Sequence, residues 1–228
     1  MNITHETINL NTWSEVDKFL SMGSISVPFD YLERASQREY PRDAFSKGQL
    51  VSKLWMLEKL QDLNNGRNDI HTIAILGCWI GSIVDFLQKS FIINRVYGFD
   101  IDPVSIELAE KFNAHYVQDN WKFKGVVADV SMLTTRYMVF QIGGDLIEVT
   151  PSIVINTSCE HMGTEWFDTA SKDQLIVMQT NDSPQYDGHI NTCSSIEEMQ
   201  SKYPMSNTLY VGEMRTPAYI RFMQIGYK

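Results

Sequence analysis

The stretch from Thr72 to Asp102 constrains the fold more than any other part of the chain. Residues 73–76 form a short apolar run rich in β-branched side chains, which predicts a buried strand. Gly77 and Gly81 bracket a turn, and apolar residues then recur with helical spacing up to residue 90. A second strand, predicted over residues 96–101, is followed closely by acids. The pattern predicts a strand, turn, helix and strand, with the two strands parallel.

Such a unit indicates a binding site for a nucleoside. It brings backbone N–H groups and a helix N-terminus close to the carboxyl ends of two parallel strands, where open α/β sheets bind nucleotides. An acid at the end of the second strand can accept hydrogen bonds from both hydroxyls of a ribose. Asp100 has that position here. We therefore expect a nucleoside-binding, Rossmann-like domain.

The rest of the chain is expected to complete one α/β sheet. Residues 1–70 are expected to be helical and to form an N-terminal lid or cap. The clearest helix in this region is expected to end at residues 64–66. Residues 71–228 are interpreted as the Rossmann-like domain. A hairpin signal at residues 143–145 predicts a β-hairpin insertion near residues 137–149.

The fold class predicted from these elements is α/β, with a seven-stranded, mostly parallel sheet and helices on both faces. Its last two strands, predicted at residues 207–213 and 219–226, are separated by too few residues for a helical crossover. They should therefore form a C-terminal antiparallel hairpin.

Composition narrows the choice of partners and compartment. The formal net charge is −9, and no cluster of five or more basic residues occurs, which argues against a nucleic-acid partner. The three cysteines are widely spaced and include no CxxC pair, so neither a disulfide framework nor a structural zinc site is indicated. The first ten residues are too polar for a signal peptide, and no apolar run approaches the roughly 18 residues of a membrane span. We expect a cytoplasmic protein with no membrane partner; the oligomeric state is not indicated.

Residues 70–228 resemble the class I S-adenosylmethionine-dependent methyltransferases. The segment ILGCWIGSIV stands where that family has its glycine-rich motif I. Asp100, in YGFDIDP, stands at the position of the ribose-binding acid, and Asp129, in VVADV, at that of a polar residue near the adenine. Asn156, in INTSCEHM, lies where many members place substrate-binding or catalytic residues.

This resemblance implies S-adenosyl-L-methionine as the cofactor and a methyltransferase activity. It also implies a set of cofactor-binding residues at the ends of the first four core strands. The expected residues are Gly77, Cys78, Trp79, Gly81, Asp100, Ile101, Asp129, Val130 and Asn156.

Candidate catalytic groups follow the fourth and fifth core strands, which are predicted at residues 152–156 and 174–179. Glu160 and His161 are candidates for a general base, and His189 is expected to open onto the same face. The alternative is that Glu160 caps a helix and His161 is a solvated loop residue. With Cys159 and Asp182 these groups suggest a divalent metal, but their spacing resembles no defined metal motif, so no metal is expected.

The function expected from the sequence is methyl transfer to a small molecule or a protein side chain. Two alternatives remain. A non-catalytic nucleoside-binding or scaffold protein is suggested by the motif I turn, which has only Gly77 and Gly81 in place of three close glycines. A nucleic-acid methyltransferase is the weaker alternative. The region of Asn156 lacks the Pro-Pro-Tyr/Phe sequence that is common in enzymes that methylate amino groups of bases. A short-chain dehydrogenase is disfavoured, since no tyrosine has a lysine four residues on.

Overall fold

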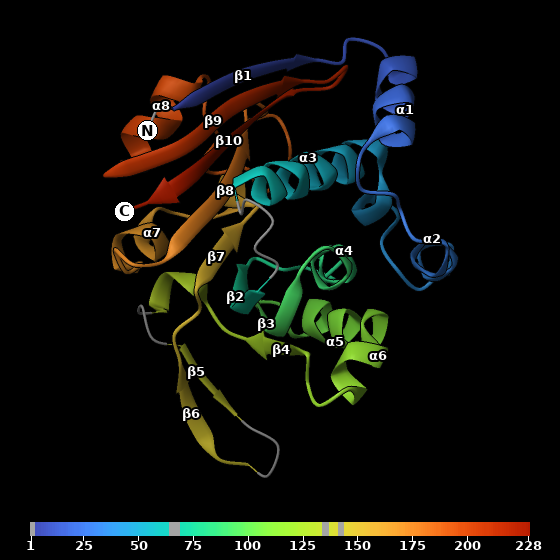
Figure 1. Cartoon of the computed structure of the whole chain (residues 1–228), viewed down its shortest axis with the longest axis vertical. Helices are drawn as coiled ribbons and strands as arrows, with labels where there is room; N and C mark the ends of the chain where they lie inside the picture. Colours follow the sequence, from blue (N-terminus) through green and yellow to red (C-terminus); the bar gives the residue numbers. More distant parts are fainter. Residues whose placement is uncertain (1–2, 64–68, 134–136, 141–143) are drawn as a thin grey trace.

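The computed structural model describes residues 3–63, 69–133, 137–140 and 144–228. Its centre is an eight-stranded sheet in the order β1-β9-β10-β8-β7-β2-β3-β4, and β5 and β6 form a separate two-stranded sheet (Figure 1). The strands are β1 (Thr4–Asn9), β2 (Asp69–Leu76), β3 (Ile92–Asp100), β4 (Phe123–Val127), β5 (Tyr137–Phe140), β6 (Leu146–Val149), β7 (Ile153–Asn156), β8 (Leu175–Asn181), β9 (Asn207–Arg215) and β10 (Ile220–Tyr227).

Helices surround the large sheet. The α-helices are α1 (Trp13–Met22), α2 (Phe29–Ala35), α3 (Lys47–Leu63), α4 (Val84–Ser90), α5 (Pro103–Phe112), α6 (Ala114–Gln118), α7 (Glu165–Thr169) and α8 (Ile196–Lys202). Three short 3₁₀ turns are η1 (Arg42–Phe45), η2 (Val130–Met132) and η3 (Cys159–His161). The predicted α/β class is confirmed.

The strand count differs from the prediction because Thr4–Asn9 is a strand and not part of a helix. β1 pairs in parallel with β9, from Thr4 opposite Tyr210 to Asn9 opposite Arg215. Its side chains alternate between exposed and half-buried, so it carries little of the apolar signal that marks a core strand. A polar anchor compensates: the Tyr210 hydroxyl donates to Glu6 at 2.7 Å.

The order of the strands creates a switch point between β2 and β7. From β2 the chain moves outward through β3 and β4, then returns to the other side of β2 as β7. All pairs among these strands, and the pair β7–β8, are parallel. β10 is antiparallel to both β8 and β9, which confirms the predicted C-terminal hairpin. Open α/β sheets bind ligands at the carboxyl ends of the strands beside such a point.

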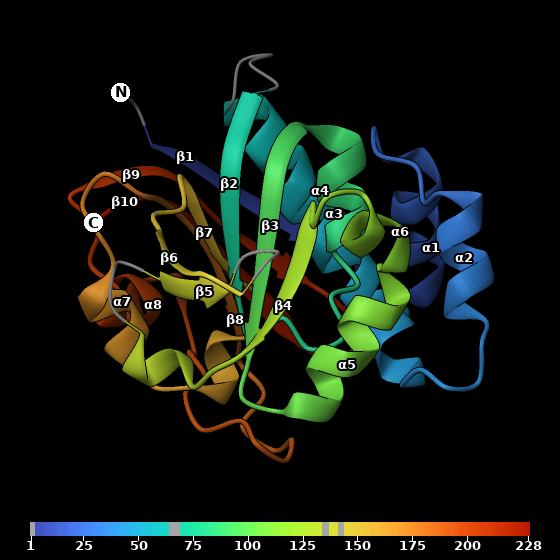
Figure 2. The same cartoon turned by 90° about the horizontal axis from the view of Figure 1, so that it is seen from below.

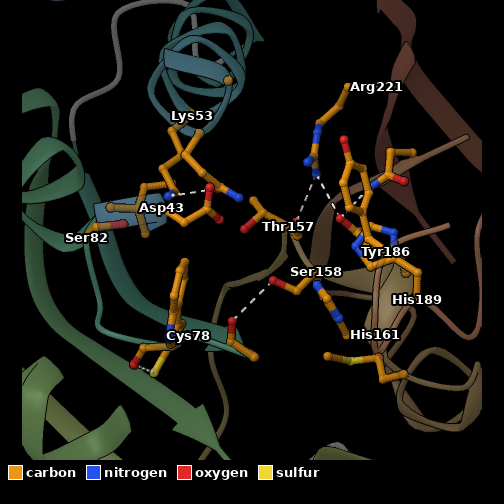
Figure 3. A pocket seen from close by; sticks show the side chains of 18 of the residues that line it. Asp43, Lys53, Cys78, Ser82, Thr157, Ser158, His161, Tyr186, His189 and Arg221 are labelled. Atoms are coloured by element: carbon orange, nitrogen blue, oxygen red, sulfur yellow. Dashed lines mark hydrogen bonds and ion pairs between the residues drawn. The ribbon is translucent and has the colours of Figure 1, made fainter. Parts of the chain in front are cut away.

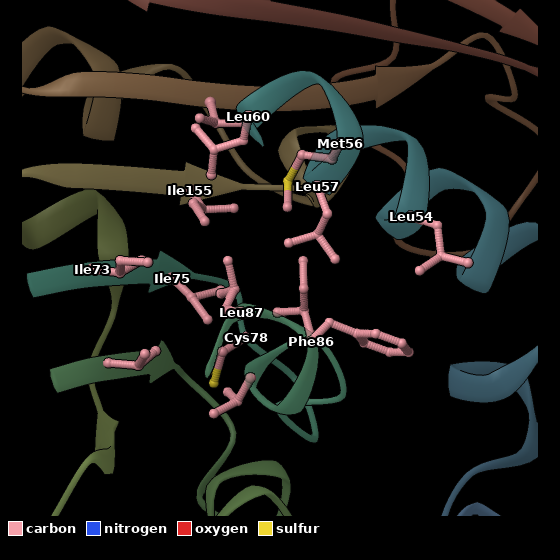
Figure 4. Close-up of a cluster of buried hydrophobic side chains, with 14 of the residues drawn as sticks. Leu54, Met56, Leu57, Leu60, Ile73, Ile75, Cys78, Phe86, Leu87 and Ile155 are labelled. Carbon is pink, nitrogen blue, oxygen red and sulfur yellow. The ribbon is translucent and has the colours of Figure 1, made fainter. Parts of the chain in front are cut away.

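Two apolar clusters cover the two faces of the sheet. On one face α3 and α4 pack on the strands, and Leu57 and Leu60 of α3 point towards the isoleucines of β2 and β7 (Figure 4). On the other face lie α7, α8 and the β5–β6 hairpin, opposite the side of α4 and α5 (Figure 2). The rings of Phe99 in β3 and Tyr137 in β5 have centroids 5.0 Å apart. Helices therefore lie on both faces, as predicted.

Strands β5 and β6 pair antiparallel in the region of the predicted insertion, whose status as an insertion stays a prediction. The expected helix end at residues 64–66 lies outside the described residues, as does residue 143 of the expected hairpin turn. The division of the chain at residue 70 stays a prediction; β1 and α3, which precede that point, both contact the sheet directly. Within the described ranges, no helix combines the length and apolar character needed to cross a bilayer.

The packing of α3 on the sheet yields a stability prediction. Leu57 is fully buried, so Leu57→Ala should lower the free energy of unfolding by roughly 2–5 kcal/mol, because it removes apolar contacts and leaves a cavity. Urea denaturation, monitored by circular dichroism, measures the change. Leu32, whose side chain is 48% exposed, provides the matched control: Leu32→Ala should stay within about 0.5 kcal/mol of the parent. Equal effects of the two substitutions would contradict this packing.

Candidate functional site

A cavity of about 1250 Å³ lies at the switch point. Residues that follow β2, β3, β4, β7 and β8 line it, so it occupies the carboxyl edge of the parallel strands. α3 and the start of β10 close its other side through Lys53, Tyr219 and Arg221. Ligand cavities typically measure roughly 300–1,000 Å³, so this one has room for two small molecules at once.

One end of the cavity is organised by the carboxylate of Asp100. Its Oδ2 accepts a hydrogen bond from the backbone N–H of Trp79 at 2.8 Å, and its Oδ1 accepts one from that of Asp102 at 3.1 Å. Trp79 has a φ of 48°, in the left-handed region that costs a non-glycine residue roughly 1–2 kcal/mol. The N–H of this strained residue points to the acid. A carboxylate offers about four lone-pair sites, so Asp100 keeps capacity for two further donors.

Seven of the nine residues expected to bind the cofactor line this cavity. They come from the loops after β2, β3 and β4, and they are Gly77, Cys78, Trp79, Asp100, Ile101, Asp129 and Val130. Gly77 has a φ of 63°, and a Cβ there would lie 2.9 Å from the Cε of Met162. The left-handed φ favours glycine at this position, where a Cβ would also lie 3.3 Å from the Cβ of Ser158 in the loop after β7.

The structure does not bring Gly81 or Asn156 to the cavity lining. Gly81 packs against α5, where a Cβ would lie 2.9 Å from Nδ2 of Asn113, and its carbonyl accepts a hydrogen bond from that amide. Asn156 is fully buried, and its Oδ1 accepts from the backbone N–H of Ser158 at 3.0 Å. Both residues shape the backbone beside the cavity, and their contact with a cofactor stays a prediction.

Cys78 contributes shape and not reactivity. Its side chain is buried, and burial together with the negative charge of Asp100 raises the pKa of the thiol well above its usual value. A thiol held in the neutral form is a weak nucleophile. Cys78 is thus a small, largely apolar part of the wall.

The opposite end of the cavity is organised by Glu160, which follows β7. Its carboxylate is 3% exposed, and Oε1 accepts hydrogen bonds from Nδ2 of Asn181 at 2.7 Å and from Nη1 of Arg221 at 3.2 Å. Removing one partner from a buried ion pair costs roughly 3–5 kcal/mol. The buried ion pair, rather than the capping of a helix, accounts for the position of Glu160.

The two histidines converge next to Glu160. The ring centroids of His161 and His189 lie 4.6 Å apart, and both rings line the cavity below Arg221 and Tyr186 (Figure 3). Cys159 and Asp182 do not join them. The Cys159 thiol is buried and donates to the Asn156 carbonyl, whereas Asp182 accepts from the backbone N–H of Ile220. The expected convergence of the histidines is confirmed; their catalytic role stays a prediction.

Lys53 is a candidate that the sequence analysis missed. It lies on α3 at 6% exposure, lines the cavity, and donates to Oε1 of Gln49 at 3.1 Å. Burial, followed by the positive charge of Arg221, lowers the pKa of Lys53 to about 7, although Asp43 acts in the opposite direction. A lysine with this pKa can exchange a proton near neutrality. The available signal was its place among the apolar residues of α3.

Comparison with solved structures identifies the fold. Magnesium protoporphyrin IX methyltransferase from Synechocystis, with bound SAH, superposes with a TM-score of 0.58 at 16% identity over 93% of this chain and 97% of that one. The chain has a methyltransferase fold. The SAH-bound methyltransferase of Podospora anserina gives 0.55 at 12% identity and 95% coverage of both chains.

The methyltransferase fold also appears in the N-methyltransferase NodS from Bradyrhizobium japonicum, with a TM-score of 0.52 at 8% identity over 75% of this chain and 94% of that one. The sequence matches no protein-family model, and no curated protein matches it closely enough to count as a relative. At these identities the comparisons concern the fold, and the reaction has to be argued from the site.

The pKa of Lys53 predicts how stability depends on pH. The pKa of a lysine in the unfolded chain is about 10.4. Between about pH 7 and 10 the unfolded chain therefore binds more protons than the folded one. The free energy of unfolding should therefore rise with pH in this window, by at most roughly 1.4 kcal/mol per pH unit from this group. In Lys53→Met this contribution should vanish, which makes the variant gain most stability at and below pH 7.

Urea denaturation of both proteins at about pH 7 and about pH 9.5 tests this prediction, with exposed Lys172→Met as the control. Identical pH slopes in the parent and in Lys53→Met would show that Lys53 is not held with a lowered pKa.

Proposed function

We propose that this chain is an S-adenosyl-L-methionine-dependent methyltransferase that acts on a small molecule or a protein side chain. The observation that carries the proposal is the Asp100 carboxylate at the switch point, held by the Trp79 N–H with lone pairs left for a ligand. The methyltransferase fold, shared with proteins solved with bound SAH, supports it independently.

The residues at this end of the cavity fit the cofactor. Asp100 would accept from the ribose hydroxyls, while Ile101, which is 67% exposed, and Val130 offer apolar surface for a base. Asp129 lies beside them, and its Oδ1 accepts from the Ser131 N–H at 2.9 Å. When bound, S-adenosyl-L-methionine supplies an electrophilic methyl group on a sulfonium. The chain's own task is to align an acceptor with it and to exclude water.

The acceptor would occupy the other end of the same cavity, close to Glu160, His161 and His189. Glu160 is bound to Arg221 through Oε1, so it fits the role of a fixed acceptor of hydrogen bonds better than that of a mobile base. Lys53 reaches the cavity from α3, and with its lowered pKa it is a further candidate for the base. A base is needed only if the accepting atom loses a proton during the transfer.

The volume of the cavity favours a compact acceptor over a polymer. A nucleoside cofactor fills part of the 1250 Å³, and the remainder suits a small molecule or an inserted side chain. The net charge of −9 adds no attraction for a polyanion.

Titration calorimetry with S-adenosylmethionine and S-adenosylhomocysteine tests the proposal. Asp100→Asn should weaken binding at least about fivefold, which is roughly 1 kcal/mol, because it removes charge-assisted hydrogen bonds to the ribose. Asp173→Asn, an exposed acid in the loop before β8, should bind like the parent. Unchanged affinity in Asp100→Asn would remove this acid from the cofactor site.

The same samples separate the alternative functions. A scaffold protein would bind the nucleoside without any turnover of methyl acceptors, or would bind neither form. A nucleic-acid enzyme would bind RNA or DNA with an affinity that falls steeply as salt increases.

A further inference from the structure

We propose that Glu160, His161 and His189 form a binding site for a divalent transition-metal ion. One potential ligand atom from each residue lies within 4.8 Å of those of the other two. The spacing of these residues in the sequence matches no defined metal motif, because His189 is 28 residues beyond His161 and belongs to the loop after the next strand. The fold alone brings the three side chains together.

Both histidines are held with the same ring nitrogen turned to a carbonyl. Nδ1 of His161 lies 3.2 Å from the Gly188 carbonyl oxygen, and Nδ1 of His189 lies 2.6 Å from that of Ser183. A carbonyl only accepts, so in the neutral imidazole each Nδ1 carries the proton and each Nε2 has a free lone pair. This is the arrangement of metal-binding histidines, which donate their other N–H to a carbonyl or carboxylate.

The carboxylate of Glu160 has one oxygen available. Oε1 accepts from Asn181 and Arg221, but Oε2 is buried and has no hydrogen-bond partner among the residues that the structure describes. A buried carboxylate oxygen without a partner is costly and calls for an explanation. A cation bound between Glu160 and the two imidazoles supplies one.

The surroundings hold the three candidate ligands in place. The Glu160 carbonyl accepts from the backbone N–H groups of Ile190 and Asn191, at 2.8 and 3.0 Å, which ties η3 to the loop that carries His189. Asn181 links both sides: its Nδ2 donates to Glu160, and its Oδ1 accepts from the N–H of Ser183, whose carbonyl orients His189. Second-sphere contacts of this kind affect metal affinity by roughly 10–100-fold.

The ligand set selects the class of metal. Two imidazole nitrogens and one carboxylate oxygen suit Zn²⁺, Fe²⁺, Co²⁺ or Mn²⁺, whereas Mg²⁺ and Ca²⁺ prefer oxygen ligands throughout. Ligand atoms around a tetrahedral ion with bonds of about 2.1 Å lie roughly 3.4 Å apart, so the ligands must draw together on binding. His161 is exposed and can make this movement.

Three protein ligands leave at least one coordination position open, which is typical of a catalytic rather than a structural site. All three residues line the cavity, so an open position would take water or an oxygen of the acceptor. The binding of an acceptor oxygen rests on the proposed function, whereas the metal site itself does not. An acceptor that binds the metal in this way would carry a hydroxyl or carboxylate group.

Titration of the chelator-treated full chain with CoCl₂ tests the site, by calorimetry and by the visible absorption of bound Co²⁺. We expect one Co²⁺ per chain, displaced by Zn²⁺ but not by equimolar Mg²⁺. His161→Asn and His189→Asn place an amide N–H near the position of Nδ1 and remove Nε2. Each should weaken Co²⁺ binding at least ~10-fold and abolish the absorption. His5→Asn, in β1, should bind like the parent.

Thermal unfolding of each variant without metal shows whether the variant is still folded. His161 is exposed, so its substitution should leave the fold intact and is the decisive one. Absence of Co²⁺ binding by the parent, or parental affinity in both histidine variants, would overturn the metal site. SAH titrations of the same variants keep the two proposals apart. Co²⁺ binding without SAH binding would retain the metal site and reject the methyltransferase.

Discussion

The buried negative charge of Glu160 is the constraint around which one end of the cavity is built. A carboxylate with 3% exposure persists only if it is neutralised and hydrogen-bonded, and Arg221 and Asn181 do both. These partners come from β10 and β8, while Glu160 follows β7. One ion pair and one hydrogen bond therefore fix the relative positions of three strand ends, which form part of the cavity wall.

The end of the cavity at Asp100 is organised differently, because backbone N–H groups hold the carboxylate. Asp100 and Trp79 are joined across 21 residues by a single N–H···O contact, and the positive φ of Trp79 is the local cost of that contact. The turn needs fewer glycines than the motif it resembles, because Trp79 adopts the left-handed conformation that a glycine would otherwise provide. The two ends thus combine a rigid carboxylate and a strained loop within one cavity.

Local patterns account for what could be predicted from the sequence. Most strands and helices from residue 72 onward follow from short apolar runs, helical spacing and the Gly77 turn, and most of the expected cofactor residues reach the cavity. β1 was missed because a half-buried polar strand depends on pairing with β9, which no local pattern reveals. Lys53 was missed for a related reason: its burial, and hence its pKa, arises from Arg221 and the sheet beneath α3.

The pairing of β1 with β9 has a consequence for how the molecule is made. Thr4 and Tyr210 are neighbours in the sheet, yet nearly the whole chain separates them, so this edge has a very long loop to close. During synthesis residues 4–9 leave the ribosome long before residues 207–215 exist. The β1–β9 edge of the sheet can therefore form only after residues 207–215 have been synthesised, when the strand that ends at Asp100 is already present.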